Sequence, residues 1–168
     1  FIADSYVNDP LMVLPRYMDL VAGAHIDEVR VIGKEAAAYA EQNKAIAVAA
    51  VPPFYFKYTE NDLFLFFKEL IDSVSIPFYV YDNPGATGNI LSPELLNRLA
   101  ENGLHGVKDS TFDIGKTYMV MRKVHKQEFD VVIGSESLLL PAFVMGAQAC
   151  ISGLANVLPE LMHQLFIT

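Results

Sequence analysis

The sequence predicts an α/β fold with a parallel sheet. Short runs rich in β-branched and aromatic residues alternate with longer segments in which apolar residues recur at helical spacing. The predicted strands are apolar throughout, which is typical of parallel strands covered on both faces. No linker or low-complexity stretch divides the 168 residues, so we expect one domain over residues 1–168. A flavodoxin-like open sheet and part of a (β/α)8 barrel both fit, because a complete barrel needs about 250 residues.

The first elements carry clear local signals. Residues 16–24 are expected to form a strand, and residues 25–43 follow as a helix with apolar residues at helical spacing. Residues 44–53 form a continuous apolar run that a proline pair ends, which indicates a buried strand. The next helix is expected over residues 59–73, because Thr59 is a suitable N-cap.

The later elements repeat the same alternation. Residues 76–84 form a predicted strand with a proline near each end. The clearest helix covers residues 92–103, since Ser92 is an N-cap residue and Pro93 fits the first helical position. The remaining expected elements, in chain order, are a strand at 104–110, a helix at 113–127, a strand at 129–136, a helix at 137–147, a strand at 149–155 and a helix that begins at 158.

Composition excludes several classes of protein. The formal net charge is −8 and the 12 lysines and arginines are scattered, so we expect no nucleic-acid partner. No apolar stretch reaches the roughly 18 residues of a membrane helix, so no membrane partner is expected either. The single cysteine, Cys150, predicts no internal disulfide, a reducing compartment and a cytoplasmic location.

Polar residues gather at the carboxyl ends of the predicted strands. Ligands bind at this edge in both candidate architectures, so we expect function on this one face. The residues at these ends are Tyr55, Tyr81, Asp82, Asn83, Thr87, Gly88, Lys108, Asp109, Ser110, Gly134, Ser135, Glu136, Ser152 and Asn156.

Lys108 stands out because it directly follows a short apolar run. A lysine is costly to bury unless it is paired, so one reading is a side chain that reaches solvent or pairs with Asp109. The other reading is an amine nucleophile that attacks a carbonyl and forms a Schiff base. Tyr81 ends the preceding strand, where its phenol could move protons, or it could be a core tyrosine with a hydrogen-bonded hydroxyl.

Five segments in chain order carry a resemblance to a known family. They are PPFYF, YVYDNPGATG, GVKDST, VIGSE and GAQACISGLANVLPE. Together they resemble the dihydrodipicolinate synthase / N-acetylneuraminate lyase family of class I pyruvate-dependent aldolases, over residues 17–163.

The resemblance implies a (β/α)8 barrel and a lysine Schiff base. It assigns the Schiff base to Lys108 and proton relay to Tyr81, and it matches Tyr55 to an aromatic pair that in some members reaches a neighbouring subunit's site. It implies no metal or organic cofactor, and a dimer or tetramer for the full-length protein. The substrate-binding positions expected from it are Asp82, Thr87, Gly134, Ser135, Glu136, Ser152 and Gly153.

Departures from the family motifs bear on the substrate. Synthases that act on aspartate semialdehyde usually carry an arginine where this chain has Ala86, and a methyl group cannot replace a bidentate guanidinium. Sialate lyases carry G-x-D-E where Glu136 and Ser137 stand here. We therefore expect a lyase that forms or cleaves a 2-keto-3-deoxy sugar acid, with pyruvate and an aldehyde as partners. Dihydrodipicolinate synthase and N-acetylneuraminate lyase activity are the alternatives within the family.

Other departures concern the extent of the chain. The family's G-T-x-G-E loop, which binds the keto-acid carboxylate, is not found, and residues 1–15 look like a helix that leads into the third barrel strand. The expectation is a fragment with strands three to eight, without the first two strands and the C-terminal helices, and with its activity open. Residues 41–45 also replace the usual glycine-containing turn.

Two readings compete with an aldolase. A flavodoxin-like binding or signalling domain would make Lys108 and Tyr81 structural. A family homologue that senses keto acids without turnover would keep both residues in the pocket. Turnover separates a sensor from an aldolase, whereas imine formation alone does not.

Overall fold

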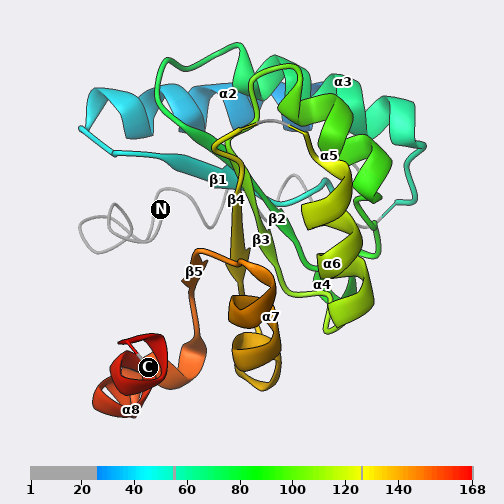
Figure 1. Cartoon of the computed structure of the whole chain (residues 1–168). Helices are drawn as coiled ribbons and strands as arrows, with labels where there is room; N and C mark the ends of the chain where they lie inside the picture. The colour runs from blue at the N-terminus through cyan, green and yellow to red at the C-terminus, as the bar shows by residue number, and fades with distance from the viewer. Residues whose placement is uncertain (1–25, 55, 126, 168) are drawn as a thin grey trace.

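The computed structural model describes residues 26–54, 56–125 and 127–167. The predicted helix at 1–15 and the predicted strand at 16–24 lie outside these ranges. Within them, the chain forms a five-stranded parallel sheet in which neighbouring strands are also consecutive in sequence (Figure 1). The strands are β1 (Val48–Ala50), β2 (Phe78–Asp82), β3 (Gly106–Asp109), β4 (Asp130–Ile133) and β5 (Ala149–Cys150).

The predicted helix at 25–43 and the predicted helices between and after these strands are confirmed, and α4 (Pro84–Thr87) is an additional helix that the sequence pattern does not indicate. Thr59 and Ser92 cap two of them as expected, each by accepting a hydrogen bond from a backbone N–H of the first turn. The helices are α2 (Ile26–Gln42), α3 (Glu60–Ile71), α4 (Pro84–Thr87), α5 (Pro93–Ala100), α6 (Ile114–Lys123), α7 (Leu139–Met145) and α8 (Pro159–Ile167). Two 3-10 turns, η2 (Glu136–Leu138) and η3 (Gly153–Asn156), complete the described part of the chain.

The prediction of a strand over residues 149–155 is wrong beyond Cys150. Only Ala149 and Cys150 pair with β4, and the chain then turns into η3. The Ser152 hydroxyl accepts a hydrogen bond from the Leu154 backbone at 3.0 Å, which bends the chain away from the sheet.

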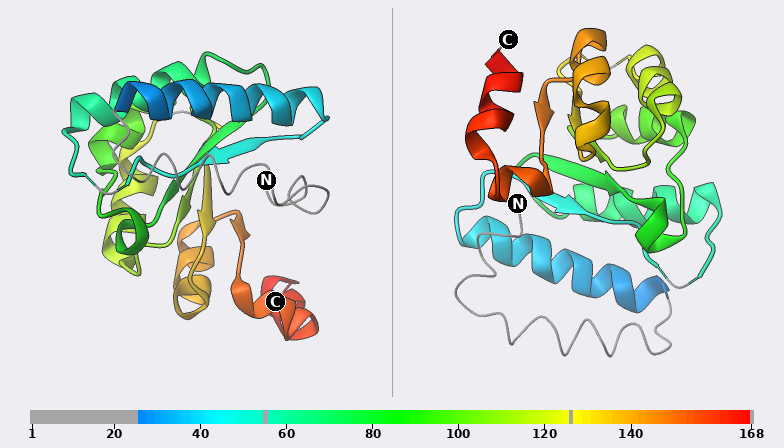
Figure 2. Two further views of the ribbon diagram at one scale, coloured as in Figure 1. Left: turned by 180° about the vertical axis from the view of Figure 1, so that it is seen from behind. Right: turned by 90° about the horizontal axis from the view of Figure 1, so that it is seen from below.

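The strand order excludes the flavodoxin-like alternative. A flavodoxin-like sheet has the order 2-1-3-4-5 and carries helices on both faces. Here the order is β1-β2-β3-β4-β5, and right-handed crossovers in one direction place every connecting helix on the same face. Two views of the ribbon show this one-sided helical layer (Figure 2).

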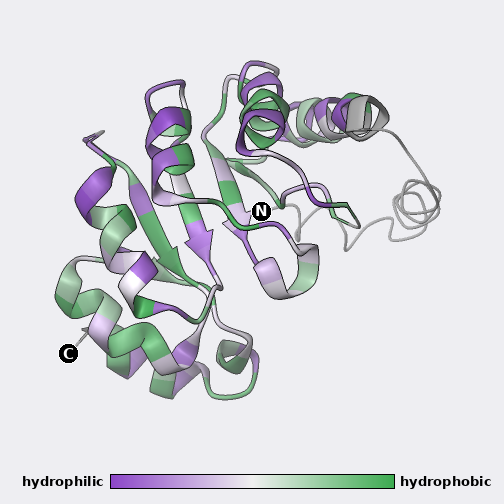
Figure 3. Ribbon diagram, turned by 90° about the vertical axis from the view of Figure 1, so that its right-hand side faces the viewer, coloured by the Kyte–Doolittle hydropathy of each residue, from purple (hydrophilic) through white to green (hydrophobic). Residues whose placement is uncertain are grey.

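The hydrophobic core lies between the sheet and its helical layer. Val48, Phe78, Val80 and Val107 point into it and are at most 2% exposed. Burial alternates along β2, so the expectation that both faces of the strands are covered is wrong in this chain. The strands are largely hydrophobic in Figure 3, with hydrophilic segments at their ends.

The opposite, inner face of the sheet carries polar side chains. Tyr79 donates a hydrogen bond to Asp130 across β3, with 2.5 Å between the oxygens. Gly106 lies between them, and a Cβ there would be 2.6 Å from the Tyr79 ring. Glycine at this position therefore makes the contact between β2 and β4 possible.

The turn into β1 contains a strained residue. Lys44 has φ of 65°, in the left-handed region that favours glycine. The turn from α2 to β1 therefore keeps the geometry of a glycine turn without the glycine.

The last helix lies on the far side of β5 from α7 (Figures 1 and 2). Phe143 of α7 and Phe166 of α8 meet edge to face, with 5.5 Å between ring centroids. These two helices and β5 line a pocket of about 320 Å³ that includes Cys150, whose thiol pKa is raised by burial. In the described part of the chain, no helix combines the length and apolarity needed to cross a membrane.

Candidate active site

Tyr81 and Lys108 lie side by side on the inner face of the sheet. They are partners in the register between β2 and β3, so their side chains point to the same side. The Lys108 Nζ lies over the Tyr81 ring, 4.0 Å from its centroid. The predicted nucleophile and the predicted proton donor are therefore in direct contact.

Two polar side chains form hydrogen bonds with the phenol oxygen of Tyr81. The Asn83 side-chain nitrogen donates to it at 3.2 Å, and the Ser110 hydroxyl is a second hydrogen-bond partner. Burial by itself raises the Tyr81 pKa, but the Ser110 hydrogen bond, the charge of Lys108 and the Asn83 hydrogen bond together hold that pKa below its ordinary value. The site favours the phenolate form more than water does.

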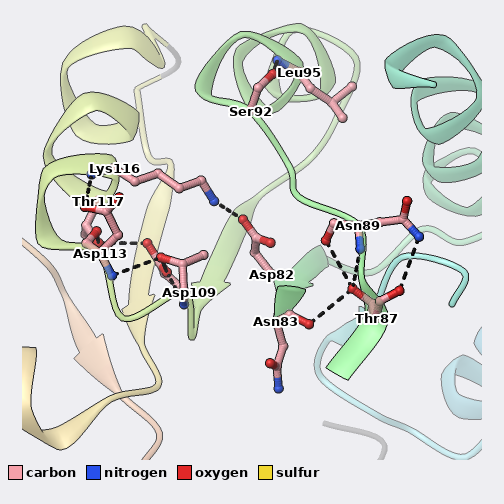
Figure 4. A network of polar contacts seen from close by, with 11 residues as sticks. Asp82, Asn83, Thr87, Asn89, Ser92, Leu95, Asp109, Asp113, Lys116 and Thr117 are labelled. Carbon is pink, nitrogen blue, oxygen red and sulfur yellow. Dashed lines mark hydrogen bonds and ion pairs between the residues drawn. The ribbon is translucent and has the colours of Figure 1, made fainter. Parts of the chain in front are cut away.

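The turn after β2 fixes Asn83. Its side-chain carbonyl caps α4 by accepting from the Ala86 backbone N–H at 3.3 Å, and its backbone carbonyl accepts from the Thr87 hydroxyl at 3.1 Å. Thr87 is buried and also bonds to the Asn89 carbonyl. The Asn89 amide in turn donates to two carbonyls of segment 53–58, at 2.8 Å each. The loops after β1 and β2 are thereby held together. Figure 4 shows the part of this network that joins Asn83, Thr87 and Asn89.

Ser110 reaches Tyr81 because Gly134 leaves space for it. The Ser110 backbone N–H donates to the Asp82 carbonyl at 2.9 Å, which extends the pairing of β2 and β3 by one residue. A Cβ at Gly134 would be 1.9 Å from the Ser110 oxygen and 3.2 Å from Lys108 Cε. Gly134 therefore permits the close approach of three strand ends.

Asp82 and Asp109 point to the opposite face of the sheet. Asp82 is fully buried and forms an ion pair with Lys116 of α6 (Figure 4). Burial is the main reason why the Asp82 pKa is raised, although Lys116 opposes the shift. Asp109 accepts hydrogen bonds from Thr117 at 2.8 Å and from the Thr111 hydroxyl at 2.7 Å. Both carboxylates join the strand ends to α6.

Glu136 is held on the far side of β4. It accepts a hydrogen bond from the Ser152 hydroxyl at 2.5 Å and from the Leu154 backbone at 3.1 Å. The Ser152 hydrogen bond is the main reason why the Glu136 pKa lies below its ordinary value. Gly153 follows in an exposed position, whereas Ser135 is buried and its hydroxyl has no hydrogen-bond partner among the described residues.

The predicted site residues thus fall into three groups. Lys108, Tyr81 and Gly134 come together on the inner face, Glu136 and Ser152 pair nearby, and Asp82 and Thr87 are buried in supporting contacts. Tyr55 lies outside the described residues. Asn83 and Ser110 received no role from the sequence, although both are polar residues just beyond a strand end. Within the described ranges, no cluster of His, Cys, Asp and Glu is placed to hold a metal ion.

Reactive side chains at the carboxyl ends of consecutive parallel strands are the arrangement found in (β/α)8-barrel enzymes. A model of the dihydrodipicolinate synthetase family matches residues 33–168, most of the sequence. The chain belongs to this family.

Two curated relatives carry the same name. The 4-hydroxy-tetrahydrodipicolinate synthase of Methanopyrus kandleri is 34% identical over 151 residues, which cover 88% of this chain and 49% of the relative. The enzyme of the same name from Archaeoglobus fulgidus is 35% identical over 129 residues, which cover 75% of this chain and 44% of that one. The chain therefore spans about half the length of the curated relatives it matches.

Solved structures show the same fold. Dihydrodipicolinate synthase from Aquifex aeolicus superposes with a TM-score of 0.76 at 28% identity, covering 80% of this chain and 46% of that one. A prophage protein of the same family from E. coli K12, solved in complex with pyruvate, superposes with a TM-score of 0.73 at 27% identity, covering 76% and 44%. The predicted fold class, α/β with part of a (β/α)8 barrel, is confirmed.

Proposed function

We propose that this chain carries the Schiff-base centre of a lyase that acts on pyruvate and related 2-keto acids. The observation that supports it is the contact between the Lys108 amine and the Tyr81 phenol, 4.0 Å from nitrogen to ring centroid. An amine nucleophile beside a proton donor is the minimum equipment for imine formation. The names of the relatives and the pyruvate in a related structure agree with this chemistry.

The reaction uses Lys108 as nucleophile and Tyr81 as acid and base. The neutral amine of Lys108 attacks the C2 ketone, and the carbinolamine loses its hydroxyl as water after Tyr81 supplies a proton. In cleavage, the C3–C4 bonding electrons move into the cationic iminium and give an enamine. The C4 hydroxyl loses its proton to the Tyr81 phenolate, and C4 with its substituents leaves as an aldehyde. Protonation at C3 and hydrolysis then release pyruvate and restore Lys108.

For the substrate, we propose a 2-keto-3-deoxy sugar acid. Ala86 is exposed in α4 and offers no charge to the second carboxylate of a dicarboxylic product. The names of the relatives favour a second candidate, the condensation of pyruvate with aspartate semialdehyde. Assays with both substrates distinguish the two. The homo-oligomer and the cytoplasmic location stay predictions.

Trapping with borohydride tests the Schiff base. The 168-residue chain is incubated with pyruvate and borohydride, and its intact mass is measured. One pyruvyl adduct is expected, and it should be absent in Lys108→Ala but present in Lys123→Ala, which removes an exposed lysine of α6. A cooperatively folded chain that forms no adduct would overturn the proposal.

A further inference from the structure

We propose that Asn83 and Ser110 are positioning residues that direct hydrogen-bond donors at the Tyr81 phenol oxygen and make Tyr81 the better proton donor. The inference rests on the proposed function for its purpose, since the proton serves chemistry at Lys108. Its physical content, the ionisation of Tyr81, can be measured without any substrate.

Asn83 can present only a donor to Tyr81. Its side-chain oxygen is already used to cap α4, where it accepts from the Ala86 backbone N–H at 3.3 Å. The amide nitrogen therefore faces the phenol oxygen, 3.2 Å away. Because Asn83 lies two residues after Tyr81, at the first turn after β2, its cap and its contact with the phenol are fixed together.

Ser110 is the second hydrogen-bond partner of the phenol and lies directly after the end of β3. Its side chain is 7% exposed, and its backbone N–H is fixed on the Asp82 carbonyl at 2.9 Å. The absent side chain of Gly134 leaves the space that the hydroxyl occupies. Ser110 and Asn83 thus approach the phenol from two different segments.

The charged groups around Tyr81 make these neutral donors important. Lys108 of β3 faces the ring directly. Asp82 and Asp109 lie on the other face, bound to α6, and Glu136 beyond β4 is hydrogen-bonded to Ser152. Once Lys108 is consumed in a neutral carbinolamine, Asn83 and Ser110 continue to stabilise the phenolate.

The test is the titration of Tyr81 followed by ¹³C NMR on chain labelled at the tyrosine Cζ. The signal is assigned with Tyr81→Phe. Ser110→Ala and Asn83→Ser each remove one donor, while serine keeps the cap of α4, so each should raise the Tyr81 pKa by about 0.5 to 1 unit. Asn83→Asp also keeps the cap but replaces the donor with a carboxylate, so its upward shift should be larger.

Three variants are used so that the result does not depend on the folding of any one. The inference is overturned if the Tyr81 pKa in every folded variant stays within 0.2 units of its value in the parent chain. This tolerance corresponds to about 0.3 kcal/mol. Failure of the proposed function would look different, because the parent chain would form no pyruvyl adduct while the Tyr81 titration still responded to the substitutions.

Discussion

Gly134 and Ser110 are packed so closely that a Cβ at Gly134 would lie 1.9 Å from the Ser110 hydroxyl oxygen. The same Cβ would lie 3.2 Å from Lys108 Cε and 3.2 Å from the Asp109 carbonyl. Any side chain at position 134 must therefore displace the hydroxyl, and with it the surroundings of the lysine.

Gly134→Ala is expected to impair imine formation strongly. Displacement by about 1 Å at a reacting group can lower a rate by about 100-fold. The measurement is the rate of pyruvyl adduct formation under borohydride trapping. Gly115→Ala, in the exposed first turn of α6, is the matched control and should leave the rate unchanged. Equal rates in both variants would show that the chain tolerates a side chain at position 134.

Lys116→Ala is expected to destabilise the fold by about 3 kcal/mol, because it leaves the fully buried Asp82 carboxylate without its cation. Urea unfolding at pH 7 measures the change. Lys123→Ala removes one partner of an exposed ion pair with Glu94 and should cost much less. Similar losses in the two variants would contradict a special role for the buried pair.

Tyr79 is expected to remain protonated to high pH. Burial, the hydrogen bond to Asp130 and the charge of Asp130 raise its pKa from 10.0 to about 12. The stability that this phenol contributes is present below pH 10 and is lost as pH rises through about 12. Asp130→Asn should lower the Tyr79 pKa toward 10.0, as measured by ¹³C NMR. A Tyr79 pKa that is unchanged in this variant would show that burial alone raises it.

Lys44→Gly is expected to stabilise the chain by about 1 kcal/mol. A non-glycine residue in the left-handed region carries a steric cost of this order, and Lys44 has φ of 65°. Thermal and urea unfolding measure the gain. Lys44→Ala keeps the Cβ and the strain, so it should show no comparable gain; stabilisation by both substitutions would point to the lysine charge instead.

Local signals explain how much of the fold the sequence could predict. Ser92 and Thr59 act on the backbone of their own first turn, so the helices they begin were predicted within a residue at their start. The sequence does not predict the short helix α4, because its N-cap Asn83 directly follows β2 and the segment is indistinguishable from the end of that strand. The early end of β5 depends on a Ser152 contact that hydrophobic pattern does not encode.

The candidate site was predictable only where a residue broke the apolar pattern. Lys108 did so, and its register with Tyr81 follows from parallel pairing of consecutive strands. Tyr81 and Asp82 are adjacent in β2 and must face opposite sides of the sheet. Which of the two faces the helices is not revealed by continuous apolar runs. The roles of Asn83 and Ser110 depend on contacts between separate segments.

The alternation along β3 has a consequence for how such a chain can vary. Lys108 faces the chemistry and Asp109 faces the helical layer, one residue apart. Inserting a single residue before them would exchange the faces to which the two side chains point. The Asp109 carboxylate would then face the side where the imine forms, and the Lys108 ammonium group would face the helical layer. An insertion of two residues would keep both orientations. Substrate preference can therefore diverge through replacements at every second strand position, while the intervening positions continue to maintain the fold.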